Sequence, residues 1–112
     1  MNMIGSANQV EFVTLCLEIR RLSSKHLAMG HSVIPYDILL FVYLNHLVQK
    51  KITVKELFAS LTYSDMGVRY HLNRLISTEW VLLNKNSNDF RSKYCEPTNK
   101  CIHQFSQFCN DL

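Results

Sequence analysis

Residues 53–78, TVKELFASLTYSDMGVRYHLNRLIST, decide the fold. The stretch begins with a capping box, because the Thr53 hydroxyl and the Glu56 carboxylate can each satisfy a free backbone N–H at a helix start. That first helix is short. After a tight turn, Ser64 can cap a second helix that runs to about Thr78. Two short helices joined by a tight turn predict a helix-turn-helix unit.

The hydrophobic period changes from helical to strand-like directly after this unit. Residues 80–83 predict a short strand, with Trp80 as a core anchor, and residues 91–96 predict a returning strand. The Asn- and Ser-rich residues 84–89 between them predict a polar turn. A hairpin directly after the second helix makes the unit winged, and we expect the wing at about residues 84–92.

Three further helices are predicted around this unit. Apolar residues at three- and four-residue steps predict an amphipathic helix over residues 8–28. A second helix begins at Pro35, whose missing N–H costs nothing in a first turn, and runs to about Gln49. It is apolar almost all round, so it is expected to be the central core helix. A proline opens a last helix over residues 97–110.

The predicted fold class follows from this order. We expect a single domain that covers all 112 residues and is mainly α with a small β-hairpin, a winged helix-turn-helix. Its winged core would lie at residues 35–96, between the two terminal helices. The hydrophobic fraction of 47% supplies enough apolar material for a core.

Charge and hydropathy restrict the function classes. A formal net charge of +3 is compatible with a polyanionic partner without establishing one. The longest apolar run, residues 38–44, is too short to cross a bilayer, so no membrane partner is predicted. The first residues lack a basic segment followed by an apolar one. We therefore expect a cytoplasmic protein with reduced thiols.

No catalytic, metal or cofactor site is predicted. The cysteines form no CxxC pair and no two histidines stand at a zinc-site interval. Neither a G-x-S-x-G nucleophile motif nor a phosphate loop occurs, so an enzyme is not expected. The cysteines are interpreted as partly buried small hydrophobes, with a redox sensor as the alternative. They are Cys16, Cys95, Cys101 and Cys109.

Residues 35–98 resemble the MarR/SarA-like winged-helix transcription regulators. The matching runs are VKEL at residues 54–57, VRYHLNRL at residues 68–75 and the D-x-R at residues 89–91. The resemblance implies a regulator that binds duplex DNA, in which Asp89 fixes Arg91. Where the family often has an arginine early in the first wing strand, this chain has Leu83.

The second helix of the unit is the expected recognition helix, over about residues 64–78. At about 100° per residue, its apolar residues share one side and its polar residues the other. Such a helix reaches base edges in the major groove, where arginine can pair with guanine and asparagine with adenine. Gly67 would let the backbone approach DNA closely. The predicted contacts are Ser64, Met66, Gly67, Arg69, Tyr70, Asn73 and Arg74.

The wing is expected to supply a second contact. Lys85, Arg91 and Lys93 lie on or beside the hairpin. Cations there can reach phosphates or the adjacent minor groove, and they add salt-dependent affinity rather than sequence information.

The terminal helices predict a homodimer. Each carries an apolar stripe beyond what the winged core needs, and surplus stripes often mark an interface. A two-fold pair would place two recognition helices about one DNA turn apart. The alternative is that both helices fold back onto the core of a monomer. The stripes consist of Phe12, Leu15, Ile19 and Leu22 in the first helix and Ile102, Phe105 and Phe108 in the last.

Two other functions stay open. The winged helix could be a protein-interaction module, an antirepressor or an assembly subunit, which the modest charge and Leu83 favour. It could also be a regulator that responds to a ligand or to thiol oxidation.

Overall fold

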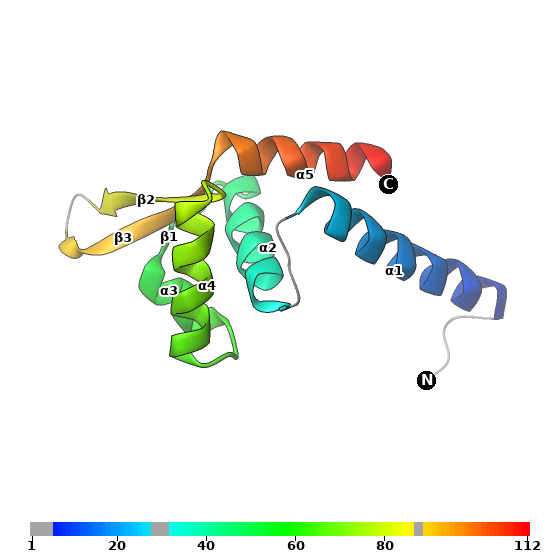
Figure 1. The fold of residues 1–112 in the computed structure, drawn as a ribbon, viewed down its shortest axis with the longest axis horizontal. Coiled ribbons are helices and arrows are strands. Elements are labelled where there is room, and N and C mark those ends of the chain that lie inside the picture. The colour runs from blue at the N-terminus through cyan, green and yellow to red at the C-terminus, as the bar shows by residue number, and fades with distance from the viewer. Residues whose placement is uncertain (1–5, 28–31, 87–88) are drawn as a thin grey trace.

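The computed structural model describes residues 6–27, 32–86 and 89–112, and it describes their side chains except at positions 6–8, 12, 86 and 89–92. The elements form a winged helix-turn-helix fold, mainly helical with a small sheet, as the sequence predicts (Figure 1). In chain order they are α1 (Ser6–His26), α2 (Ile34–Leu47), β1 (Ile52–Thr53), α3 (Val54–Ser60), α4 (Asp65–Ser77), β2 (Val81–Asn86), β3 (Asp89–Pro97) and α5 (Asn99–Asp111).

The helix-turn-helix consists of α3 and α4. The predicted capping box is present, because Thr53 accepts from the backbone N–H of Glu56 while the Glu56 carboxylate accepts from that of Thr53. Ser64 caps α4 as predicted, and its Oγ accepts from the Gly67 N–H at 3.1 Å. Both helices therefore begin where a local side chain replaces the missing backbone acceptor.

The sheet differs from the prediction in two ways. It has three antiparallel strands in the order β1-β3-β2, and the two-residue strand β1 was not predicted. The wing strands are also longer than expected, since β2 continues to Asn86 and β3 begins at Asp89. Much of the predicted polar turn is thus strand, because ladder hydrogen bonds to the opposite strand override the turn preference of asparagine. Residues 87 and 88 lie outside the described residues.

The start of the last helix was also predicted wrongly. Pro97 is the final residue of β3 and pairs with Val81. Thr98 is the N-cap of α5, and its hydroxyl accepts from the backbone N–H of Cys101 at 3.2 Å. A proline can end a strand as well as begin a helix, and only the pairing with β2 distinguishes the two.

The core lies where α2 meets α4, the sheet and α5. Its fully buried side chains include Ile38, Leu39, Val42, Leu57 and Val68. Trp80 is buried, as expected of a core anchor. The expectation that α2 is central on all sides is only partly right, since three of its leucines are exposed: Leu40, Leu44 and Leu47.

The last helix packs on the chain's own core, contrary to the expected surplus stripe. Phe105 and Phe108 are buried, and the Phe105 ring stacks on that of Tyr43 from α2 with centroids 4.3 Å apart. These two aromatic side chains are therefore not available to a dimer interface. Ile102, the third residue of the predicted stripe, is partly buried.

Helix α1 contacts the core near its C-terminal end. Leu22 is buried, and the hydroxyl of Ser23 is hydrogen-bonded to that of Tyr36 at 3.1 Å. The His26 imidazole pairs with the Asp111 carboxylate at 2.7 Å, which lowers the pKa of Asp111 through that hydrogen bond. The earlier turns of α1 extend away from the core (Figure 1), which gives the domain extents of 54 × 31 × 28 Å. No helix among the described residues is long and apolar enough to cross a membrane.

Candidate nucleic-acid interface

Helix α4 has the two faces that the sequence predicts. Val68, Leu72 and Leu75 are buried against the core, whereas Ile76 is only partly buried. The polar face is open to solvent over three turns. Its exposed residues are Met66, Arg69, Tyr70, Asn73, Arg74 and Ser77.

Two arginines on this helix rest on aromatic rings. The Arg74 guanidinium lies 5.9 Å from the centroid of the Tyr70 ring, and its Nη1 donates to the Tyr70 hydroxyl at 3.1 Å. Arg69 lies 5.3 Å from the centroid of the Phe58 ring on α3. Such stacking reduces the side-chain entropy that an arginine loses when it binds a base or phosphate.

Gly67 has a packing role that the sequence did not predict, and its predicted close approach to DNA stays a prediction. A Cβ at this position would lie 3.2 Å from Ser64 Oγ and 3.3 Å from Ile34 Cδ1. The glycine therefore lets the start of α4 pack closely on the start of α2 and on its own cap. The angular positions of residues along α4 do not show this packing, because they contain no information about α2.

The turn before α4 is tied to α2 by a side-chain contact. The Tyr63 hydroxyl donates to the carboxylate of Asp37, in the first turn of α2. This hydrogen bond is the main reason that the pKa of Tyr63 is raised. The contact fixes the N-terminal end of α4, the part of a recognition helix that approaches bases.

The wing places two cations opposite each other. Lys85 on β2 pairs in register with Lys93 on β3, and both side chains are exposed. Like charges in direct cross-strand register destabilise a hairpin unless an anion lies between or over them. The side chains of Asp89 and Arg91 lie outside the described residues, so the predicted pairing of the two stays a prediction.

The junction between α4, the wing and α5 was not predicted. The Lys100 ammonium donates to the carbonyl of Thr78 at 3.0 Å and lies 4.9 Å from the centroid of the Trp80 ring. The Thr98 hydroxyl donates to the Glu79 carbonyl at 2.6 Å. These contacts satisfy carbonyls at the end of α4, and they hold the wing at a fixed angle to it.

Comparisons with known proteins agree with this geometry. No protein-family profile and no curated protein matches the chain, but solved structures do. The regulator Tm0710 from Thermotoga maritima superposes with a TM-score of 0.70 at 16% identity, covering 95% of this chain and 72% of that one. A mutant MarR from E. coli in complex with operator DNA superposes with a TM-score of 0.63 at 20% identity, covering 91% of this chain and 70% of that one. AbsC, a MarR-family regulator from Streptomyces coelicolor, superposes with a TM-score of 0.60 at 13% identity, covering 99% of this chain and 76% of that one.

The chain has the MarR-type winged-helix fold. In this fold α4 occupies the position of the second helix of the helix-turn-helix, and β2 and β3 form the wing. The wing projects on the side opposite to α1 (Figure 1).

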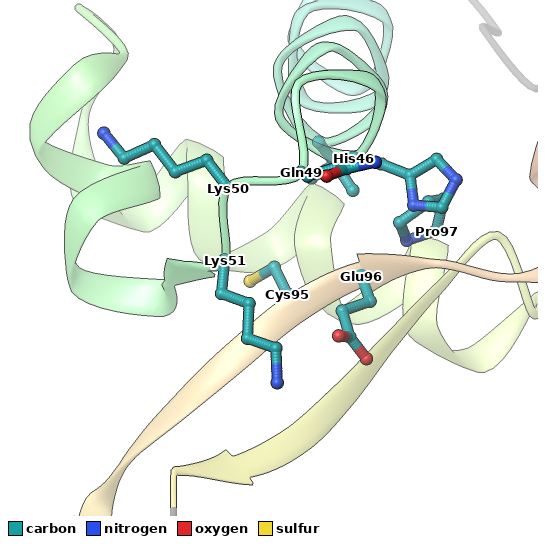
Figure 2. Close-up of a pocket in the computed structure, with 8 residues that line it drawn as sticks. His46, Gln49, Lys50, Lys51, Cys95, Glu96 and Pro97 are labelled. Carbon is teal, nitrogen blue, oxygen red and sulfur yellow. The ribbon is translucent and has the colours of Figure 1, made fainter.

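Behind the wing, the MarR-type domain has a hollow of about 280 Å³ between the end of α2 and β3 (Figure 2). Cys95 lies beneath the turn that carries Lys50 and Lys51, while His46 points toward Pro97. Burial raises the pKa of the Cys95 thiol to about 11, so the thiol stays protonated at neutral pH. No group of histidine, cysteine and acidic side chains within the described residues could hold a metal ion.

The cysteines divide into two classes. Cys95 and Cys101 are buried, as the small-hydrophobe interpretation expects, and burial also raises the pKa of Cys101 to about 11. Cys16 and Cys109 are exposed, which that interpretation did not expect. All four are free thiols. The two buried ones lack the thiolate character that a redox sensor requires.

Proposed function

We propose that this protein is a transcription regulator that binds specific sequences in double-stranded DNA. The exposed face of α4 carries the proposal: Arg69, Tyr70, Asn73 and Arg74 share one solvent-facing side of the second helix of a helix-turn-helix. Arginine and asparagine are the residues that read guanine and adenine in the major groove. The E. coli MarR in complex with operator DNA has the same fold.

The wing would bind the DNA backbone or the adjacent minor groove. Lys85 and Lys93 support this role because a phosphate between or beside them would offset their mutual repulsion. We include Arg91, whose backbone lies in β3. Ser64, the N-cap of α4, and Met66, in its first turn, would contact DNA from the end of the helix that the contact between Tyr63 and Asp37 holds in place.

A homodimer would complete the DNA-binding unit. One recognition helix reads only a few base pairs, whereas two helices related by a two-fold axis read a pseudo-palindrome with half-sites one helical turn apart. Helix α1 supports this proposal, because most of its length lies beyond the core of its own chain (Figure 1).

In-vitro selection of bound sequences from a random duplex library tests the function. We expect a pseudo-palindromic consensus after a few rounds at physiological salt. The alternative, a protein-interaction module, is favoured by the modest net charge of +3 and by Leu83 in the first wing strand. That alternative predicts no consensus and only weak binding that moderate salt abolishes.

A further inference from the structure

Strand β2 forms one edge of the sheet. The strand order is β1-β3-β2, so β2 pairs with β3 on one side and with no described strand on the other (Figure 1). Its pairing with β3 is regular from Val81 to Lys85, and the register shifts only after Lys85. We call residues 81–85 the β2 edge, which is about 17 Å long.

The backbone of every second residue on the β2 edge is left without a partner. The Thr98 N–H donates to the Trp80 carbonyl at 3.2 Å, which makes these two residues a hydrogen-bonded pair. Such pairs alternate along an antiparallel ladder, so the next residues bonded to β3 are Leu82 and Asn84. The N–H and C=O groups of the intervening residues therefore point away from β3, and within the described part of the chain no hydrogen bond outside the ladder reaches them. These residues are Val81, Leu83 and Lys85.

Most of the β2 edge also lacks the devices that keep edge strands from pairing. Charged residues, prolines and bulges serve this purpose in native sheets. Residues 81–84, VLLN, contain neither a charge nor a proline, and the ladder is irregular only beyond Lys85. The edge is therefore open to a further strand.

A hollow of about 550 Å³ lies beside the β2 edge, between the end of α4 and the start of α5. Leu82 and Leu83 both line it, although consecutive strand residues point to opposite faces of a sheet. The hollow therefore lies beyond the edge of the strand rather than over one of its faces. Both leucines are half-buried, and Ile76 of α4 adds to the same apolar lining. The volume falls within the range of ligand pockets, about 300–1,000 Å³.

The charges differ at the two ends of the β2 edge. At the wing end, Lys85 and Lys93 are opposite each other, and neither forms an ion pair with a described residue. At the other end, Lys100 is engaged by a backbone carbonyl and by the Trp80 ring, and the exposed Glu79 lines the hollow. An acidic side chain of a partner would thus fit at the wing end, and an apolar one at the hollow.

We propose that the β2 edge is the docking site for an extended acidic peptide segment of another protein, which adds to the sheet as a strand antiparallel to β2. Only another strand offers donors and acceptors at the spacing of the outward groups of Leu83 and Lys85. The segment would place an acidic residue opposite Lys85 and apolar residues opposite Leu83 and Leu82, which gives the order acidic-x-apolar-apolar. This second binding surface goes beyond the reading of DNA by α4 and does not depend on it.

Selection from a random peptide library displayed on phage tests the site, with the full chain and no DNA. We expect enrichment of the order acidic-x-apolar-apolar. Fluorescence anisotropy then measures the affinity of a synthetic copy of the enriched peptide. Methylating the backbone nitrogen of its first apolar residue removes a donor to the Leu83 carbonyl and should weaken binding about tenfold. Methylating the preceding nitrogen, which would point to solvent, is the matched control and should change the affinity by less than about twofold.

Two pairs of protein variants test the same contact from the other side. Leu83→Pro removes the outward N–H without breaking a bond to β3, whereas Leu83→Ala loses the side chain and keeps that N–H. The proline variant should bind the peptide about tenfold more weakly than the alanine variant. Leu82→Glu places a carboxylate in the hollow and should weaken binding on the order of tenfold. Leu112→Glu changes an exposed leucine in another part of the fold and should have no effect.

The outcomes that would overturn the proposal are distinct. Far-UV circular dichroism checks that each variant is folded, and the methylated peptides carry the test if Leu83→Pro is not. Absence of an enriched order, equal effects of the two methylations, or equal binding by Leu82→Glu and Leu112→Glu would exclude strand addition at β2. A change in the mass of the peptide-free protein in Leu82→Glu, measured by light scattering, would show that a second copy occupies the edge instead. No duplex is present in these measurements, so their failure would leave the proposed DNA binding standing.

Discussion

At the scale of single residues, the contact between Arg74 and Tyr70 makes them one unit on the exposed face of α4. We expect Arg74→Ala to weaken specific binding by ~1–3 kcal/mol, the range for a lost bidentate base contact. Tyr70→Phe removes the hydroxyl that receives the arginine and should lose part of the same free energy. The effects of the two substitutions should therefore not add when combined.

Fluorescence anisotropy with a selected duplex measures this prediction. Asn73→Ala should cost a similar amount but should add to Arg74→Ala, since no contact joins the two side chains in the structure. Lys50→Ala removes the same charge from an exposed position at the end of α2 and serves as the control. Unchanged affinity and sequence preference for both Arg74→Ala and Asn73→Ala would rule out this face as the reading surface.

The thiols give a second prediction at this scale. A colorimetric disulfide reagent should titrate only Cys16 and Cys109 in the folded protein, and all four cysteines in urea. The pKa of the Cys95 and Cys101 thiols is raised from 9.0 to about 11 by burial. The protonated thiols thus contribute stability that is fully present below pH 9 and is lost as the pH rises toward 11. Rapid reaction of Cys95 or Cys101 in the native state would show that the core opens easily.

At the scale of the elements, Thr98 connects the end of α4 to the start of α5. Its hydroxyl donates to the Glu79 carbonyl and accepts from the Cys101 N–H. We expect Thr98→Val, which keeps the shape, to lower the free energy of unfolding by ~1–2 kcal/mol. Thr98→Ser keeps both hydrogen bonds and should be close to neutral. Urea titration measures both, and equal midpoints for the two variants would show that the hydroxyl contributes nothing.

The wing carries its own prediction. Lys85→Ala should lower affinity equally for all duplexes and reduce the slope of log affinity against log salt by ~1, as expected for one phosphate contact. It should also leave stability unchanged or slightly higher, because it removes a like-charge pair with Lys93. Lys85→Arg is the matched control and should keep the slope. A slope that does not change in Lys85→Ala would exclude a phosphate contact there.

The helix-turn-helix was predictable at this scale and the end of the wing was not. The caps Thr53 and Ser64 act on backbone groups within three residues, so their sequence pattern is sufficient. The strand character of Pro97 depends on Val81 across the hairpin, and β1 exists only through its pairing with β3. A local pattern contains no information about such partners.

At the scale of the whole molecule, the proposed dimer would set the spacing of its DNA site. Two recognition helices on a rigid two-fold pair require half-sites about 10 base pairs apart. Inserting five base pairs between the selected half-sites turns one half-site to the far side of the duplex and should reduce affinity to that of a single half-site. Inserting ten restores the facing but doubles the separation, which a rigid pair cannot span, so affinity should again be that of a single half-site. Electrophoretic mobility shifts with the three duplexes measure this, and equal affinity for all three would mean that the copies bind independently.

The sequence by itself determined which helices form and which residues of α4 share a face. Periodicity and caps act over one or two helical turns, so they define the helix-turn-helix and place Arg69, Tyr70 and Arg74 together on α4. Only the tertiary structure decided what covers each face. It buried Phe105 in the chain's own core and left Leu44 exposed, although both belong to apolar stripes. The physical reason is that burial depends on the surface that arrives from elsewhere in the chain, and periodicity specifies a face without specifying its partner.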